Sequence, residues 1–326
     1  MGRRVLITGV SGFWGTELAR RLERDPEFEY IAGLDVRPPA ADLGRTEFIR
    51  ADVRNPLLAK LLPPTQVDTV VHCDVLLVPE PGKAPGQLHD INVIGSLQLL
   101  AACEKTDTVR TIVVRGSTAI YGAEPNAPGF FTEDMARRFP LRMRFQRDVG
   151  ELENYFENFA RRYPDVTVMM LRYQPTLGTA IDSPLTRYLQ QPVVATQLGY
   201  DPLLQFVHAE DAVSALEASV HRPVRGPVNV AGEGSISLSK LLRLAGRVTI
   251  PVPAPLFGTA LGAGARFGLA RLPPEAVLWL RNGLTVDAGR LIGEVGFRPR
   301  STADAVEDFV AELRGRRVLP DMRDAA

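Results

Sequence analysis

The feature that most constrains the fold is a glycine-rich turn between a short apolar run and an amphipathic stretch. Residues 5–8 read Val-Leu-Ile-Thr, and glycine follows at positions 9, 12 and 15. Gly9 permits a tight turn, Gly12 lets backbone N–H groups approach a pyrophosphate, and Gly15 allows a helix to pack closely on a sheet. The pattern predicts a dinucleotide site formed by Gly9, Ser11, Gly12, Phe13, Trp14 and Gly15.

An acidic residue stands at the distance that such a site requires. Asp35 ends the second apolar run, 20 residues after Gly15. There a carboxylate accepts hydrogen bonds from the ribose hydroxyls of NAD and repels the 2′-phosphate of NADP. Arg37, two residues further on, keeps NADP open as the less favoured alternative. We therefore expect NAD as the cofactor, with Asp35 and Arg37 beside its adenosine ribose.

The pattern of the chain indicates the fold class. Short β-branched runs at 5–8, 30–35, 47–50, 69–73, 111–115 and 167–172 alternate with helical stretches at 12–24, 57–62, 89–104 and 145–162. Unbroken apolar strands that alternate with helices predict an α/β fold, a Rossmann-type doubly wound parallel sheet. After Gly178 the segments shorten and prolines cluster, which predicts a smaller, mostly helical substrate lobe. The expected domains are 1–178, with some later segments returning to it, 179–314, and a frayed tail at 315–326.

Composition narrows the functional classes. Lys+Arg and Asp+Glu are both 38, so the chain has no excess of basic residues that would indicate nucleic acid as a partner. The longest apolar stretch, 254–265, is too short for a transmembrane segment, and no secretory leader is recognisable. Cys73 and Cys103 predict buried thiols in a reducing compartment, and no His/Cys/Asp cluster has metal-ligand spacing. These observations predict a soluble cytoplasmic protein without a metal.

A series of motifs extends over nearly the whole chain. After the TGxxGxxG turn come Asp52-Val53, Val71-His72-Cys73, Asn92-Val93-Ile94-Gly95, the segment Ser117–Gly122, Leu171-Arg172-Tyr173, the segment Phe206–Asp211, and Val286-Asp287 with Gly296–Pro299. In this order they resemble the extended short-chain dehydrogenase/reductases, specifically the NAD-dependent epimerase/dehydratase family. The resemblance implies an oxidoreductase or isomerase acting on a nucleotide sugar or a related small molecule.

The resemblance also implies roles for individual residues. Asp52 and Val53 correspond to the family's adenine-binding pair, and Ser117 corresponds to its active-site serine. Two positions depart from the family pattern: Asp74 replaces a small neutral residue, and Pro175 stands where nucleotide-sugar enzymes often carry asparagine. The further cofactor-site residues implied in this way are Asp52, Val53, Cys73, Asp74, Asn92 and Pro175.

The family's acid/base pair is missing. In the family a tyrosine transfers the proton, and a lysine four residues later lowers its pKa and holds the nicotinamide ribose. None of the seven tyrosines here has lysine four residues on. The best register places Phe145 at the tyrosine position and Val149 at the lysine position. Neither side chain carries a proton, so the standard mechanism is not expected.

Other polar residues are candidate substitutes. Ser117 could bind substrate and Tyr121 could transfer a proton, although both types often serve structure at such positions. The remaining alternatives, each more often solvated or structural, are Arg142, Arg144, Arg147, Asp148, Glu151 and His208. Two hypotheses therefore stay open: an epimerase/dehydratase-like enzyme with a non-standard acid/base, and a catalytically silent dinucleotide-binding sensor or scaffold.

A homodimer is expected from the resemblance. The helices at 89–104 and 145–162 would form the interface. An apolar stripe made by Ile91, Ile94, Leu97, Leu100 and Ala101 is wider than one buried helix face needs, which favours the same pairing.

Overall fold

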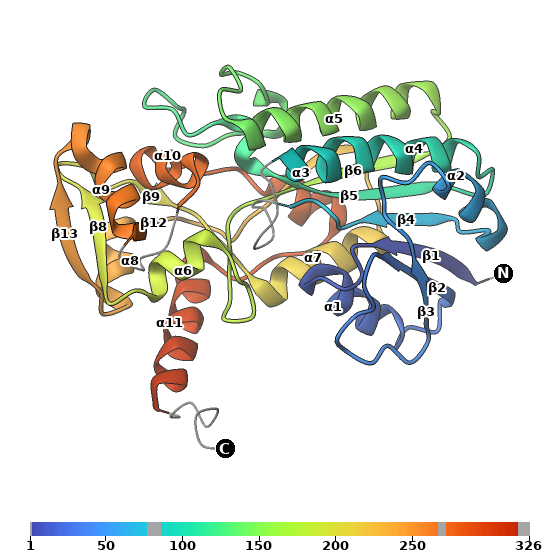
Figure 1. The fold of residues 1–326 in the computed structure, drawn as a ribbon, viewed down its shortest axis with the longest axis horizontal. Helices are drawn as coiled ribbons and strands as arrows, with labels where there is room; N and C mark the ends of the chain where they lie inside the picture. Colours follow the sequence, from blue (N-terminus) through green and yellow to red (C-terminus); the bar gives the residue numbers. More distant parts are fainter. Residues whose placement is uncertain (1, 77–85, 267–271, 319–326) are drawn as a thin grey trace.

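A seven-stranded parallel sheet forms the larger part of the molecule (Figure 1). The computed structural model describes residues 2–76, 86–266 and 272–318. The sheet order is β11-β6-β5-β4-β1-β2-β3, and every neighbouring pair is parallel. Its strands are β1 (Arg3–Thr8), β2 (Phe28–Asp35), β3 (Thr46–Arg50), β4 (Thr69–His72), β5 (Thr111–Ser117), β6 (Thr167–Tyr173) and β11 (Gly226–Val230). This is the doubly wound order of dinucleotide-binding folds, so the sequence-based prediction of fold class is confirmed.

Helices cover both faces of the sheet. On one face α1 (Phe13–Leu22) packs beside α7 (Ala209–His221). On the other face lie α2 (Leu58–Leu61), α4 (Ser96–Glu104) and α5 (Arg144–Arg162), as Figure 1 shows. Val5 and Ile7 point to the first face and Leu6 to the second, all at most 1% exposed. A strand buried on both faces explains why its sequence reads as an unbroken apolar run.

The helix predicted at 89–104 is more elaborate in the structure. It begins with α3 (Gly86–His89), widens into the π-helical segment η2 (Asp90–Gly95), and continues as α4. Such a bulge adds one residue to a turn and is frequent at functional sites. Asn92 lies within it and is 1% exposed.

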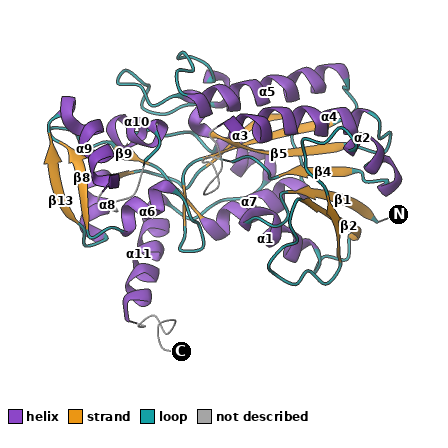
Figure 2. Cartoon of the chain, in the orientation of Figure 1, coloured by secondary structure: helices purple, strands orange, loops and turns teal. Residues whose placement is uncertain are grey.

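A second lobe lies at the far end from the chain's N-terminus (Figure 2). Its helices are α6 (Pro184–Gln190), α8 (Leu238–Leu244), α9 (Ala254–Arg266), α10 (Pro274–Asn282) and α11 (Thr302–Val318). Three pairs of short strands accompany them: β7 (Thr176–Leu177) with β10 (Val207–His208), β8 (Val193–Gln197) with β13 (Val248–Val252), and β9 (Leu203–Leu204) with β12 (Ile236–Ser237). The prediction of a mostly helical lobe therefore missed these strand pairs.

Two segments late in the chain bear on the expected domain boundaries. Strand β11 joins the edge of the main sheet beside β6, and α7 lies on that sheet. Helix α11 continues to Val318, into the segment expected to be a frayed tail. Within the residues described, no helix is long and apolar enough to cross a membrane.

Candidate functional site

The glycine turn has the geometry that a pyrophosphate requires. Gly9 has a φ of +68°, which favours glycine, and a Cβ on Gly15 would lie 2.6 Å from the Cα of Val10. Gly12 is the N-cap of α1 and provides no side-chain cap, so the N–H groups of Phe13 and Trp14 remain available at the helix N-terminus. These groups, with the helix dipole, fit a phosphate anion.

Asp35 lies directly beside this turn. One carboxylate oxygen accepts a hydrogen bond from the backbone N–H of Ser11 at 3.1 Å, and the other accepts one from Val36 at 2.7 Å. The Ser11 hydroxyl donates to the carbonyl of Arg37 at 2.5 Å. The structure thus brings Ser11, Asp35 and Arg37 together at the end of β2, where an adenosine ribose would lie.

Asp52 and Val53, the residues expected around the adenine, follow β3 and lie against the end of η2. The Asp52 carboxylate accepts three hydrogen bonds from the Arg54 guanidinium, at 2.9, 3.2 and 2.6 Å. Val53 packs so closely on η2 that a Cβ on Gly95 would lie 2.6 Å from its Cγ1. Asp52 and Arg54 also line a shallow hollow with Ile94. An adenine at this edge would therefore meet an ion pair rather than a lone carboxylate.

The segment after β4 runs along the glycine turn. A Cβ on Gly9 would lie 3.2 Å from the Cα of Asp74, so the two backbones are in contact. Asn92 holds this segment from η2: its side chain accepts from the N–H of Leu76 at 2.8 Å and donates to the Leu76 carbonyl at 2.9 Å. Cys73 is buried, and burial raises the pKa of its thiol to about 12. Cys73 therefore stays a neutral thiol.

Arg115 is a site residue that the sequence reasoning missed. It lies near the end of β5, and its Cζ is 4.9 Å from the centre of the Trp14 ring. Its Nε donates to the Cys73 carbonyl at 3.2 Å, and a terminal nitrogen donates to the carbonyl of Val75. Burial lowers the pKa of Arg115 from its ordinary value. The signal in the sequence is a single charge directly after the β-branched run Thr111–Val114.

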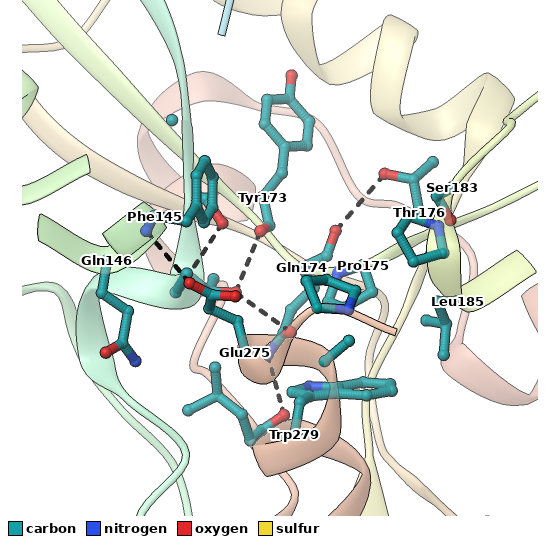
Figure 3. A pocket seen from close by; sticks show the side chains of 18 of the residues that line it. Phe145, Gln146, Tyr173, Gln174, Pro175, Thr176, Ser183, Leu185, Glu275 and Trp279 are labelled. Carbon is teal, nitrogen blue, oxygen red and sulfur yellow. Dashed lines mark hydrogen bonds between the residues drawn. The ribbon is translucent and has the colours of Figure 1, made fainter. Parts of the chain in front are cut away.

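A pocket of about 190 Å³ opens next to this cluster, between the two lobes (Figure 3). The sheet side contributes Trp14, Arg115, Ser117 and Pro175, and the second lobe contributes residues of α6 and α10. Trp14 also packs against the Tyr173 ring, 4.9 Å between centres. The pocket therefore begins beside the glycine turn, at the start of α1.

The two sequence-predicted candidate catalysts lie in different surroundings. Ser117 lines the pocket, and its Oγ accepts a hydrogen bond from the N–H of Ala119 at 3.2 Å. Tyr121 is not among the lining residues; its hydroxyl donates to Asn229 at 2.6 Å and accepts from Arg172 at 2.9 Å. Burial raises the pKa of Tyr121 to about 12. This environment suits Tyr121 as a buried link between β11 and β6, away from the pocket.

The positions of the missing acid/base pair are packed with apolar side chains. Phe145 is 6% exposed and lines the pocket at the start of α5, and Val149, one turn later, is 1% exposed. Both belong to the apolar core of the second lobe and the cleft, together with Ile120 and Trp279. Nothing at either position can move a proton.

Glu275 is a second site residue that the sequence reasoning missed. It lies in the first turn of α10, and its carboxylate accepts a hydrogen bond from the backbone N–H of Phe145 at 3.1 Å (Figure 3). It also lines the pocket. A carboxylate from the second lobe thus lies against Phe145, the residue that the sequence register predicts at the family's tyrosine position. No local signal marks it, because the sequence around it reads only as a helix start.

The alternatives weighed from the sequence make structural contacts. Asp148 pairs with His89 at 2.8 Å, and Glu151 accepts a hydrogen bond from Tyr155 at 2.8 Å. His208 caps α7 by accepting from the N–H of Glu210. Arg142 is largely exposed, and Arg144 and Arg147 lie on the outer side of α5. None of these residues lines the pocket.

One surface cluster has side chains of metal-ligating types. His221 lies 3.2 Å from Asp25 and 3.5 Å from Glu27. The two carboxylates approach opposite nitrogens of the same ring, which is the arrangement of an ion-pair network.

Comparison with known proteins decides the family. The model of the NAD dependent epimerase/dehydratase family matches residues 5–231. The chain belongs to the NAD dependent epimerase/dehydratase family. Rv0501 of Mycobacterium tuberculosis is 37% identical over 323 residues, which cover 97% of this chain and 85% of that protein. This confirms the resemblance drawn from the motifs and the assignment of NAD as the family's cofactor.

More distant relatives have named activities. The dTDP-4-dehydro-6-deoxy-D-allose reductase of Streptomyces bikiniensis is 27% identical over 270 residues, covering 74% of this chain and 80% of the reductase. Two solved structures share the fold. MoeE5 in complex with UDP-glucuronic acid and NAD has a TM-score of 0.72 at 23% identity, covering 97% of this chain and all of MoeE5. UDP-glucuronic acid 4-epimerase from Bacillus cereus has a TM-score of 0.72 at 18% identity, covering 96% of this chain and 99% of the epimerase.

Proposed function

We propose that this chain is an NAD(H)-binding oxidoreductase or isomerase in which Glu275 replaces the family tyrosine as the proton-transferring group. The observation that carries the proposal is the position of Glu275, hydrogen-bonded to the backbone of Phe145 and lining the same pocket as Ser117. The open N-terminus of α1, Asp35 and the close approach at Gly15 all fit a bound dinucleotide. The relatives that act on or bind nucleotide sugars support a small-molecule substrate.

Each of the pocket residues has its own proposed role in the reaction. When bound, NADH supplies a hydride and NAD⁺ accepts one. Glu275, as a carboxylate, takes the proton of a substrate hydroxyl during oxidation, and as a carboxylic acid returns it to the carbonyl oxygen during reduction. The Ser117 hydroxyl donates a hydrogen bond to the same oxygen. Phe145 and Trp279 exclude water from this end of the pocket.

Substitution of Glu275 tests the proposal. Wild type is assayed by NAD(H) absorbance against ketones and secondary alcohols of graded size and against nucleotide sugars. Glu275→Gln is expected to lower turnover by about 10²–10⁴-fold, because a positioned acid/base contributes that much. Its calorimetric affinity for NAD⁺ should stay unchanged. The matched control Glu157→Gln removes an exposed carboxylate of α5 and should leave turnover unchanged.

Two outcomes would contradict the proposal. Equal turnover in wild type and Glu275→Gln would remove Glu275 from the chemistry. Saturable NAD binding with no turnover on any compound would favour the second candidate, a silent dinucleotide-binding protein. The observation behind that candidate is the apolar packing of Phe145 and Val149.

We expect NAD(H) to bind more tightly than NADP(H). Asp35 lies against the glycine turn, where its charge repels a 2′-phosphate and its oxygens accept from free ribose hydroxyls. Calorimetric titration with each cofactor measures the two dissociation constants. Asp35→Asn should reduce the difference in affinity between NAD(H) and NADP(H). Tighter binding of NADP(H) to wild type would show that Arg37 dominates this end of the site.

We also propose a homodimer through the helices at 89–104 and 145–162, that is η2, α4 and α5, supported by exposed apolar side chains. Ile94 and Leu97 are 37% and 40% exposed, whereas Leu100, further along the same stripe, is 5% exposed. Burial of Ile94 and Leu97 against a second copy would remove apolar surface from water. Light scattering at micromolar concentration should give the dimer mass, and Leu97→Glu should give the monomer. A monomeric wild type would contradict the proposal.

A further inference from the structure

The pocket between the lobes is mostly apolar. Its lining includes Trp14, Phe145, Ile181, Leu185, Leu278 and Trp279, which come from α1, α5, α6, α10 and the segment before α6. Leu185 and Trp279 are each 7% exposed, so they form firm walls rather than mobile surface side chains. A ligand in this pocket would exchange water for contact with aromatic and aliphatic carbon.

The polar side chains of the lining are largely engaged within the protein. Thr118 donates to the Tyr173 carbonyl at 3.1 Å, and Gln174 donates to the Leu284 carbonyl at 3.0 Å. The Ser183 hydroxyl accepts from the N–H of Thr186 and thereby caps α6. A sugar ring carries several hydroxyls, and each one buried without a partner costs about 1–3 kcal/mol. Among these lining residues, the Trp279 Nε1–H is buried without a partner and Ser117 and Glu275 keep free hydrogen-bonding capacity, which suits one oxygen of a ligand better than the several hydroxyls of a sugar.

The charges in the pocket also disfavour an anionic ligand. Among the lining residues described, Arg115 is the one cation, and its guanidinium is already held by two backbone carbonyls and the Trp14 ring. The second lobe contributes the Glu275 carboxylate instead, on the side where a substrate lies. A nucleoside diphosphate would bring negative charges toward this carboxylate.

We propose that the substrate of this pocket is a neutral, mostly apolar ketone or secondary alcohol, and not a nucleoside diphosphate sugar. The inference rests on the proposed function for the role of the carbonyl or hydroxyl group, which Glu275 and Ser117 would meet. The rest of the molecule would be hydrocarbon in contact with α6 and α10.

Tryptophan fluorescence tests this directly, because Trp14 and Trp279 are the two tryptophans of the chain and both line the pocket. The probes are 2-decalone, a saturated bicyclic ketone, and UDP-glucose, each titrated in the presence of saturating NAD⁺ and in its absence. We expect 2-decalone to change the emission saturably and to bind at least about tenfold more tightly than UDP-glucose. Tighter binding of UDP-glucose, or no saturable effect of 2-decalone, would overturn the inference.

Two variants test whether the ligand binds in the pocket. Leu278→Lys puts a charge on the lining and should weaken 2-decalone binding more than about tenfold. Ala276→Leu fills space in the same wall without a charge, and should weaken binding even if Leu278→Lys does not fold. The control Val248→Lys changes an exposed side chain of β13 and should leave binding unchanged. Unchanged 2-decalone affinity in Ala276→Leu would place the ligand elsewhere and overturn the inference.

The titrations separate this inference from the proposed function. Calorimetry with NAD⁺ alone reports on the cofactor site. Binding of 2-decalone without binding of NAD⁺ would contradict the proposed function and leave the ligand class supported. Binding of NAD⁺ together with a preference for UDP-glucose would support the proposed function and contradict the ligand class.

Discussion

Replacing Glu153 by alanine is expected to lower the free energy of unfolding by about 3–5 kcal/mol, because it leaves a buried charge without its partner. Arg172 and Glu153 are 2% and 1% exposed, and they form two hydrogen bonds of 2.9 and 2.8 Å between β6 and α5. Burial lowers the pKa of Arg172, but the hydrogen bonds and charge of Glu153 outweigh this effect and raise it overall. The guanidinium therefore stays charged and needs the carboxylate.

Urea unfolding of matched variants measures this effect. Glu157→Ala removes an exposed carboxylate that lies 3.6 Å from Arg137, and should change stability by less than about 0.5 kcal/mol. The double variant Glu153→Leu with Arg172→Met removes both charges and should recover much of the loss. A Glu153→Ala protein within about 1 kcal/mol of wild type would show that the pair contributes little.

The second large effect concerns turnover on nucleotide sugars. Wild type is expected to show no measurable epimerase or dehydrogenase turnover on common nucleotide sugars. Phe145 and Val149 lack the tyrosine–lysine chemistry of the family, which contributes about 10²–10⁴ in rate, and we propose that Glu275 transfers the proton of a mostly apolar substrate instead. Cofactor binding should persist, since the backbone N–H groups of the glycine turn do not depend on either residue.

Restoring the pair gives the matching experiment. Phe145→Tyr with Val149→Lys should tighten NAD binding through a ribose contact, and it should lower stability because Val149 is 1% exposed. Phe145→Tyr alone is the control that adds the hydroxyl without the cation. NAD(H) absorbance and product analysis across a nucleotide-sugar panel provide the readout. Robust wild-type turnover on nucleotide sugars that persists in Glu275→Gln and disappears on mutation of Tyr121 would identify a different catalyst and contradict the proposed chemistry.

The sheet and the dinucleotide turn could be predicted from the sequence because both depend on local pattern. The apolar runs match β1 to β6 within a few residues, and the glycines at positions 9, 12 and 15 lie at the predicted strand-to-helix turn. The two-residue strands of the second lobe could not be predicted, since two residues carry no periodicity, and Pro251 within the five-residue β13 argues against a strand there. The sequence likewise predicts an ordinary helix where the π-helical segment η2 lies, because a one-residue insertion hardly disturbs an apolar stripe.

The pocket around Phe145 and Glu275 depends on contacts between distant segments, which sequence reasoning does not reach. Glu275 meets Phe145 across 130 residues of chain, and only the packing of α10 against the start of α5 brings them together. Tyr121 illustrates the same limit. Its phenol made it a candidate for proton transfer, but the short 3₁₀ helix Thr118–Tyr121 turns its ring onto Phe131 and its hydroxyl toward Asn229.

The most direct test of the account is a crystal structure of the protein with NAD⁺ bound. The account predicts that the pyrophosphate lies on the N–H groups of residues 13–15, with the ribose hydroxyls at Asp35. It also predicts that C4 of the nicotinamide faces the pocket, with Ser117 and Glu275 on its open side. A nicotinamide excluded by Trp14 and Arg115, or turned away from Glu275, would contradict the proposed chemistry.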